Sequence, residues 1–179
     1  MERLYYSRLQ SPAGPLLIGV SSQALVALEF DRGLPKTVNG EPVEWEQADS
    51  RTAEVRRQLE QYFKGKRRDF DLKLDLRGPD FYKRCWGELL RIPFGETRSY
   101  AQIARAVGCP AGFRAVGQAN HHNPIAIIVP CHRVLASDGT LGGYGGGLPL
   151  KAKLLRLEGA AFREKLRGVD VRQMQLTAD

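Results

Sequence analysis

The chain is poor in cysteine and histidine, with three of each among 179 residues. Cys85, Cys109 and Cys131 form no Cys-x-x-Cys pair, and an odd number does not fit a disulfide framework. Residues 1–80 contain neither residue type, which excludes a zinc site built from cysteine or histidine there, and we expect no metal. Reduced thiols are typical of the cytoplasm, and we expect that location.

Long apolar segments are also absent. The longest uninterrupted one is IAIIVPC, at residues 125–131, whereas a membrane-spanning helix needs about 20 apolar residues. The first ten residues, MERLYYSRLQ, lack the apolar stretch of a secretion signal. The sequence therefore predicts a soluble protein without a membrane partner.

Excess charge is confined to one part of the chain. The net charge is +7, and residues 81–179 supply all of it, because Lys and Arg balance Asp and Glu over residues 1–80. A basic surface attracts nucleic acid, since neutralising phosphates releases condensed counterions. A solvated basic surface without such a partner is the alternative at this point.

Composition divides the chain near residue 78. Apolar, β-rich runs over residues 5–30 are broken by SPAGP and SSQ, a pattern typical of hairpin strands. Helical spacing over about residues 51–64 is carried by four side chains, Val55, Leu59, Tyr62 and Phe63. The charged run that ends at Gly78-Pro79 predicts a strand and then a linker. We expect domains at 1–78 and 79–179, and we expect no chemistry from the first.

Residues 79–179 open with a helical stripe that contains a cysteine. The stripe consists of Phe81, Cys85, Leu89 and Ile92, which favours a packed core thiol at Cys85. Ser99 and Gln102 have the spacing of a capping box, which predicts a short helix that ends at Gly108. A second helical segment follows over about residues 112–120. Two short helices across a glycine-containing turn indicate a helix-turn-helix, although such pairs also occur in ordinary α-rich domains.

The second of these helices presents small side chains. Ala115, Gly117 and Ala119 allow close approach to a groove, and Arg114 is the one long charged side chain. Such a face suits an arginine that enters the base stack. Reading of base edges needs several polar side chains and is not indicated.

The segment IAIIVPCHRVLASDGTLGGYGGG, residues 125–147, has the features of a reactive site. IAIIV predicts a buried strand closed by Pro130, which would place Cys131 at a strand end. A thiol is mostly protonated at neutral pH, so a nucleophilic cysteine needs a base or a positive field nearby. Adjacent side chains on an extended strand point opposite ways, so His132 would reach Cys131 only through a turn or a bridging water.

Several blocks together resemble a known family. PCHRV follows NP and an apolar run and precedes GGYGGG and LLRLEG; FGETRSYAQIA, FRAVGQANHHNP and, more loosely, SPAGPLLIGV match as well. The chain resembles the O6-alkylguanine-DNA alkyltransferases, which repair DNA by direct reversal. The resemblance is strong over residues 79–160.

The resemblance implies a fold and an activity. The fold would be α/β: a small N-terminal α/β domain with an antiparallel, RNase H-like sheet, then an α-rich C-terminal domain with a winged-helix-like helix-turn-helix. The protein would act once, as a monomer without a cofactor, moving the alkyl group of O6-alkylguanine in double-stranded DNA to its own cysteine. Whether O4-alkylthymine is a second substrate stays open.

The resemblance also implies roles for individual residues. The catalytic set would be the acceptor Cys131, His132 linked to it through water, and Glu158, Asn123 and Tyr100. The residues that contact DNA would be Ser99, Tyr100, Arg114, Ala115 and Gly117. The substrate pocket would be walled by Ala126, Val134, Tyr144, Gly145 and Gly146. We expect the His132–Glu158 pair to raise the thiolate fraction of Cys131 above that of a free cysteine.

Three positions depart from the family pattern, and two other functions compete. Phe113 is large, Ala126 stands where some relatives have proline, and Gly145 stands where some have serine, which leaves substrate breadth open. A cysteine hydrolase could use Cys131, His132 and either Asn123 or His121. A lesion-binding protein without chemistry would lack the nucleophile that Cys131 supplies. Glu158 as a plain surface charge and Asn123 as an ordinary turn residue are the simpler alternatives for those positions.

Overall fold

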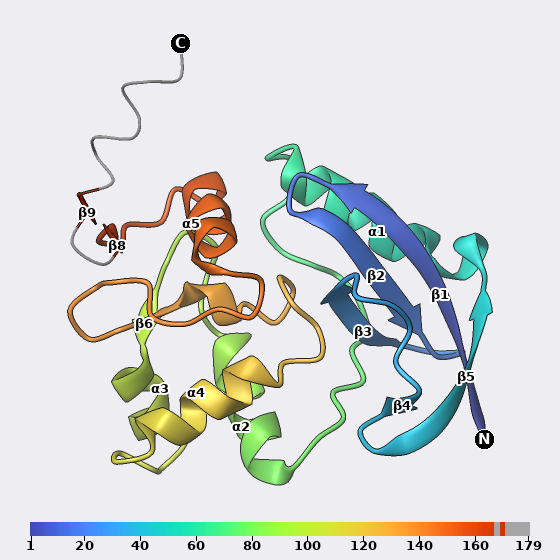
Figure 1. Ribbon diagram of the computed structural model, residues 1–179, viewed down its shortest axis with the longest axis horizontal. Helices are drawn as coiled ribbons and strands as arrows, with labels where there is room; N and C mark the ends of the chain where they lie inside the picture. Colours follow the sequence, from blue (N-terminus) through green and yellow to red (C-terminus); the bar gives the residue numbers. More distant parts are fainter. Residues whose placement is uncertain (167–168, 171–179) are drawn as a thin grey trace.

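The computed structural model describes residues 1–166 and 169–170. The chain forms two halves that lie side by side, one built on a β-sheet with a long helix and one built mainly of short helices (Figure 1). The elements are β1 (Glu2–Ser11), β2 (Gly14–Val20), β3 (Leu25–Phe30), β4 (Thr37–Val38), β5 (Glu41–Gln47), α1 (Asp49–Phe63), α2 (Asp80–Leu89), β6 (Arg98–Ser99), α3 (Tyr100–Ala106), α4 (Phe113–His121), the 3₁₀ helix η1 (Cys131–Arg133), β7 (Val134–Leu135), α5 (Leu148–Leu157), β8 (Lys165–Leu166) and β9 (Val169–Asp170). This order confirms the expected α/β class.

The large sheet has the strand order β3-β2-β1-β5-β4. The pairs β1–β2, β2–β3 and β4–β5 are antiparallel. The expected antiparallel pairing is found at these three pairs, and one further pair differs: β5 runs parallel to β1, with Trp45 opposite Leu4. A parallel neighbour needs a crossover connection instead of a tight turn. The chain supplies one by leaving β3 at one edge and returning through β4 at the other.

The first hairpin follows from its turn residues. The Ser11 hydroxyl accepts a hydrogen bond from the Ala13 amide at 3.1 Å and donates one to the Gly14 carbonyl at 2.7 Å. Gly14 has a φ of +93°, a region in which side-chain-bearing residues are strained. The strand that follows is buried on both faces, from Leu16 to Val20. This explains why its sequence reads as a continuous apolar run instead of an alternating one.

Helix α1 covers one face of the sheet (Figure 1). Its buried side chains include the predicted Val55, Leu59 and Tyr62, which pack in one cluster with β2 residues. A buried hydrogen bond of 2.6 Å between the hydroxyls of Thr52 and Ser7 joins the helix to β1. The helix therefore confirms the periodicity of residues 51–64.

The outer edge of β3 joins the two halves. Leu25 exchanges backbone hydrogen bonds with the chain around Leu74, and Leu28 exchanges them with the chain around Ile125, each through an isolated bridge. The predicted strand before Gly78 is therefore wrong: it is reduced to that single bridge, because only one short stretch lies against β3. The second bridge holds the segment before Cys131 against the sheet.

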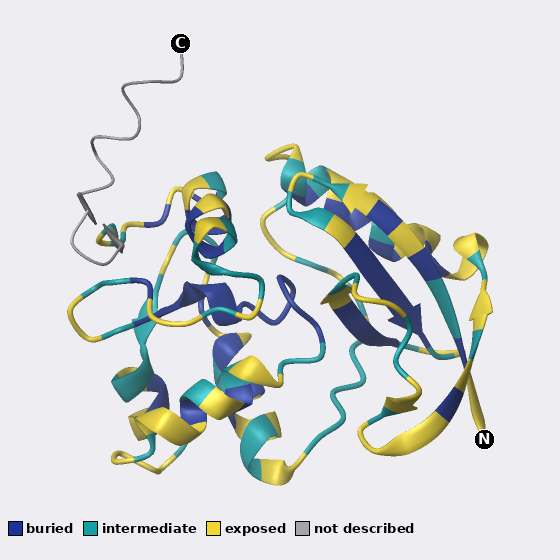
Figure 2. Ribbon diagram, in the orientation of Figure 1, coloured by how far each residue is buried: buried dark blue, intermediate teal, exposed yellow. Residues whose placement is uncertain are grey.

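Helices α2, α3 and α4 pack against one another in the second half. The Trp86 indole donates a hydrogen bond of 2.8 Å to the Ala119 carbonyl and so joins α2 to α4. Cys85 is fully buried in the same core, as its place on the stripe predicts. The capping box of Ser99 and Gln102 forms in both directions at the start of α3. One buried cluster extends from β2 through these helices to η1, seen as dark segments in both halves of Figure 2.

Candidate active site and nucleic-acid interface

Cys131 follows a buried turn, and the prediction of a strand over residues 125–129 is wrong. Ala126 completes the bridge to Leu28, after which Ile127 takes a φ of +71°. The chain then folds back, and the amides of Ile128 and Val129 bond to carbonyls within the turn. The run stays apolar because it is buried, and burial does not by itself distinguish a strand from a turn. Positive φ at a β-branched residue is strained and persists where packing holds it, as at functional sites.

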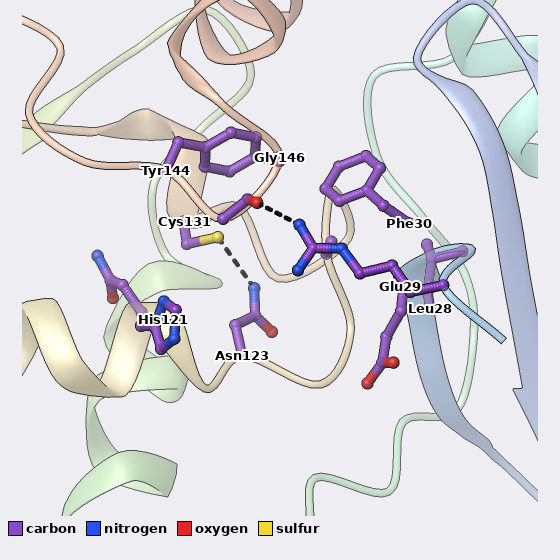
Figure 3. A pocket seen from close by; sticks show the side chains of 12 residues that line it. Leu28, Glu29, Phe30, His121, Asn123, Cys131, Tyr144 and Gly146 are labelled. Atoms are coloured by element: carbon purple, nitrogen blue, oxygen red, sulfur yellow. Dashed lines mark hydrogen bonds between the residues drawn. The ribbon is translucent and has the colours of Figure 1, made fainter. Parts of the chain in front are cut away.

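Asn123 closes this turn and contacts the thiol. Its Nδ2 donates to the Val129 carbonyl at 2.7 Å and to Sγ of Cys131 at 3.2 Å, a contact drawn in Figure 3. Its Oδ1 accepts from the Ile125 amide at 3.0 Å. One side chain therefore fixes the turn and points a donor at the sulfur.

His132 lies in the short helix η1 and is fully buried. Its Nε2 lies 2.8 Å from Oε1 of Glu158. Burial lowers the pKa of His132, although Glu158 opposes that change. Because Glu158 is ionised, Nε2 carries the hydrogen, and the neutral ring keeps a lone pair on Nδ1. Nδ1 has no hydrogen-bond partner among the described residues.

Glu158 is a buried carboxylate and not a surface charge, with a residue exposure of 5%. It caps the C-terminal end of α5, where the helix dipole disfavours a negative charge. Arg133 compensates with hydrogen bonds of 2.8 and 3.0 Å to its two oxygens, and Tyr62 donates another of 2.7 Å. Burial alone would raise the pKa of Glu158, but the bonds from His132 and Arg133 outweigh it and bring that pKa to about 2.

Burial raises the pKa of the Cys131 thiol, although the Asn123 donor and the Lys151 charge oppose the increase. The expectation of an enriched resting thiolate is therefore wrong, because desolvation of the anion outweighs its neighbours. The proton must leave the sulfur during the reaction. His132, neutral and hydrogen-bonded at one nitrogen only, has the protonation state that a base requires.

Lys151 places a cation near the site, and sequence reasoning missed it. Its Nζ is buried and donates to the carbonyls of Val134 and Gly143 at 2.6 and 3.1 Å, and also to that of Leu141. Burial lowers its pKa to about 8, and Cys131 acts in the opposite direction. These bonds join β7, through Val134, to the glycine-rich loop, through Leu141 and Gly143. The signal in the sequence that could have indicated this cation is a lysine among the apolar residues of the segment that forms α5.

Two cavities meet at Cys131. The smaller, of about 260 Å³, lies toward the sheet, and the larger, of about 540 Å³, lies between α3, α4 and the glycine-rich loop. Both are lined by Asn120, His121, Cys131, Tyr144 and Gly145. The thiol of Cys131 can therefore be reached from either cavity.

The residues expected to form the substrate pocket divide into two groups. Tyr144 and Gly145 line both cavities, and Ala126 and Gly146 line the smaller one. A Cβ at position 146 would lie 2.8 Å from the side chains of Phe30 and Leu150, so these side chains would have to shift to admit one. Val134 is fully buried and lines neither cavity; its carbonyl accepts from Lys151 instead.

The first half also lines the site, and the expectation that it supplies no chemistry of its own stays a prediction. Leu28, Glu29, Phe30 and Arg32 line the smaller cavity, and Figure 3 shows the first three on the side of the pocket opposite Cys131. Arg32 donates to the Gly145 carbonyl at 3.1 Å. No local pattern reveals these contacts, because they depend on how the two halves pack.

The residues expected to contact DNA lie at the start of α3 and on α4, and two of them, Tyr100 and Gly117, line the larger cavity. On α4, Arg114 and Ala115 are exposed and Gly117 is half-buried. Tyr100 lines the larger cavity, and its hydroxyl lies 3.4 Å from the Gly143 carbonyl, to which it donates. The Ser99 side chain is engaged in capping α3. Phe113 begins α4 with half of its surface exposed and also lines the larger cavity.

The described residues were also compared with the requirements of a metal site and of a membrane-spanning helix. Among the residues that the structure describes, no three His, Cys, Asp or Glu side chains gather as metal ligands. Within the same residues, no helix is both long and apolar enough to cross a bilayer.

Comparison with known proteins identifies the family. Residues 4–76 match the ribonuclease-like domain of 6-O-methylguanine DNA methyltransferase, and residues 80–160 match its DNA binding domain. A methylated-DNA–protein-cysteine methyltransferase of Methanosarcina barkeri is 48% identical over 87% of this chain and 97% of its own. One of Mycobacterium tuberculosis is 47% identical over 87% and 92%.

The solved structures agree. A crystal structure of Mycobacterium tuberculosis OGT in complex with DNA has a TM-score of 0.75, with 44% identity over 88% of this chain and 92% of that one. A structure described as Mycobacterium tuberculosis O6-methylguanine methyltransferase has the same TM-score and identity, over 87% and 93%. With both domains matched in order and about half of the residues identical to those of relatives, the chain belongs to the 6-O-methylguanine DNA methyltransferase family.

Proposed function

We propose that this protein repairs O6-alkylguanine in double-stranded DNA by moving the alkyl group onto Cys131. The observation that carries the proposal is the setting of the thiol: it lies where two cavities meet, beside a neutral His132 whose other nitrogen is bonded to Glu158. The DNA binding domain matched over residues 80–160 supports the choice of partner.

The alkylated base has to leave the duplex to reach the thiol. Extrusion costs a few kcal/mol, and least where alkylation has already weakened pairing. The small face of α4 approaches the groove, and the exposed Arg114 fills the space that the base leaves in the stack. The base then enters the larger cavity, between Tyr100 and Tyr144.

The transfer is a single displacement. The bond from Sγ of Cys131 to the alkyl carbon forms as the bond from that carbon to O6 breaks, and the electron pair leaves with guanine. His132 takes the thiol proton, and the Glu158 carboxylate stabilises the resulting imidazolium. The Tyr100 hydroxyl donates a hydrogen bond to the leaving base. Guanine ends neutral by taking one proton from water, and His132 returns the thiol proton to water, so no net proton is gained or lost.

The product explains why each molecule acts once. A thioether has no leaving group comparable to the guanine base, and nothing in the proposed set of residues would cleave it. The protein is therefore consumed in proportion to the lesions it repairs.

A cysteine hydrolase fits the contacts less well. In that arrangement an amide or carboxylate orients the histidine that activates the thiol. Here Asn123 bonds to the sulfur, and the partner of His132 is the deeply buried Glu158. His121 lines the cavities, but in the part of the chain that the structure describes it makes no hydrogen bond with Cys131 or His132.

We further assign DNA binding and transfer to residues 79–179, with residues 1–78 as their structural support. A cytoplasmic location suits a protein with a thiol that must stay reduced and a substrate in DNA.

Intact-mass spectrometry tests the function. After incubation with a duplex that carries O6-methylguanine, each protein molecule is expected to gain one methyl group, found on the peptide that contains Cys131. An unchanged mass, or repeated turnover by one molecule, would overturn the proposal.

A further inference from the structure

The buried polar atoms that lack partners gather around the thiol. Among the described residues, such side-chain atoms belong to Asn120, His132 and Tyr144, all of which lie beside Cys131. Buried polar groups in folded proteins are nearly always hydrogen-bonded, and leaving one unpaired is costly. His132 has a use for its free nitrogen in the proposed transfer, whereas Asn120 has no assigned role.

Asn120 is the most unusual of the three, because both atoms of its amide are unpaired. It lies near the end of α4 and lines both cavities that meet at Cys131. The amide has no hydrogen bond to break when it turns toward a ligand. A carboxamide also offers a donor and an acceptor side by side, so it suits a partner with the opposite pair.

O6-alkylguanine presents that pair next to the reacting atom. Alkylation at O6 removes the hydrogen from N1, which becomes an acceptor, while the neighbouring 2-amino group remains a donor. N1 is bonded to the same ring carbon as O6, so a residue beside the thiol is placed to reach it. Unmodified guanine carries N1–H and presents two donors, which one carboxamide cannot match.

We infer that Asn120 recognises the alkylated base, with Nδ2 donating to N1 and Oδ1 accepting from the 2-amino group. The contact favours O6-alkylguanine over guanine. It is lost after transfer, when the released guanine regains N1–H and faces Nδ2 with a second donor. This inference deepens the proposed function and rests on it.

The first test replaces the amide by an apolar side chain of similar size. Asn120→Leu removes both unpaired atoms, so the melting temperature of the free protein rises, while single-turnover transfer from O6-methylguanine duplex slows by about tenfold, the worth of one to two hydrogen bonds. A lower melting temperature would mean that the amide has a structural partner, and an unchanged rate would mean that it does not touch the base; either result overturns the inference. Gln23→Leu, an exposed amide far along the chain from the site, is the matched control and should change neither quantity.

The second test changes the base. O6-methylhypoxanthine in the same duplex lacks the 2-amino group, so the native protein should react with it about tenfold more slowly than with O6-methylguanine. For Asn120→Leu the two rates should approach each other, and an undiminished difference would overturn the contact. If the native protein gains no methyl group from either duplex, the proposed function fails and takes this inference with it. If the native protein and Asn120→Leu transfer the methyl group at equal rates, the inference is overturned and the proposed function stands.

Discussion

Nδ2 of Asn123 lies 3.2 Å from Sγ of Cys131 and 2.7 Å from the Val129 carbonyl. One amide therefore links the reacting sulfur to the turn that carries it. Because Nδ2 already donates a hydrogen bond to the sulfur in the resting protein, it is placed to stabilise the negative charge that forms when the thiol loses its proton.

The first prediction concerns the nucleophile. Cys131→Ser should abolish methyl transfer and leave affinity for undamaged duplex unchanged, because the DNA-facing residues of α4 are untouched. Intact-mass spectrometry and a gel-shift titration measure the two properties. Cys109→Ser is the matched control, since Cys109 is exposed, and it should retain full transfer. A serine variant at position 131 that still removed methyl at a comparable rate would disprove the assignment.

The second prediction concerns the stability that Glu158 contributes. Its pKa is lowered from 4.5 to about 2 in the folded protein, which corresponds to roughly 3 kcal/mol of unfolding free energy. A lowered carboxyl pKa stabilises the fold above the unfolded value. This contribution is therefore complete above about pH 5 and is lost as pH falls from 4.5 toward 2. Because Glu158 makes buried contacts with Arg133 and Tyr62, Glu158→Gln should lose about 3 kcal/mol of unfolding free energy at neutral pH.

Denaturant unfolding of Glu158→Gln against pH measures this loss. The gap between the native protein and the variant should shrink as pH falls below about 4. Glu54→Gln is the control, because that carboxylate pairs with Arg57 on the exposed face of α1 and its removal should matter less. A pH-independent gap would mean that the ionisation of Glu158 is not what stabilises the fold.

The third prediction concerns activation of the thiol by the same pair. Transfer by the native protein should be insensitive to pH above the lowered pKa of His132 and should slow below it, as the imidazole becomes protonated. Glu158→Gln should react more slowly at neutral pH and gain rate as pH rises toward the pKa of the thiol, because hydroxide then removes the proton. Single-turnover rates against pH decide this, and superimposable profiles would exclude Glu158 from activation.

The fourth prediction concerns the leaving base. Burial raises the pKa of Tyr100, so its hydroxyl stays protonated and can donate a hydrogen bond to the leaving base. Tyr100→Phe should slow transfer by about 100-fold, the typical cost of one donor aimed at developing negative charge. Affinity for undamaged duplex should not change. Tyr5→Phe, on β1, serves as the control for loss of a phenol, and equal rates for both variants would remove Tyr100 from the mechanism.

The fifth prediction separates extrusion from chemistry. Arg114→Ala should slow transfer from duplex DNA but leave reaction with the free base O6-benzylguanine unchanged, because the free base needs no extrusion. The dependence of DNA affinity on salt should weaken by about one phosphate contact. Arg57→Ala, on the exposed face of α1, should alter neither measurement. Equal slowing of both substrates by Arg114→Ala would mean that Arg114 supports the pocket itself.

Features that depend on neighbours along the chain could be predicted from the amino-acid sequence. The capping box of Ser99, the stripe that buries Cys85 and the extent of α1 arise from contacts within a few residues. Such contacts leave a periodic pattern of residue types, which is visible in the sequence alone. The ordered motif blocks likewise singled out Cys131 and its family.

How these parts meet depends on contacts between distant segments of the folded chain. His132 and Glu158 are 26 positions apart, and Tyr62 and Glu158 are 96 apart, so no local pattern marks those contacts. The apolar run before Cys131 predicts a strand but forms a turn, because burial demands the same residues in a strand and in a packed turn. The raised pKa of the thiol has the same origin, since desolvation depends on which distant segments exclude water from the sulfur.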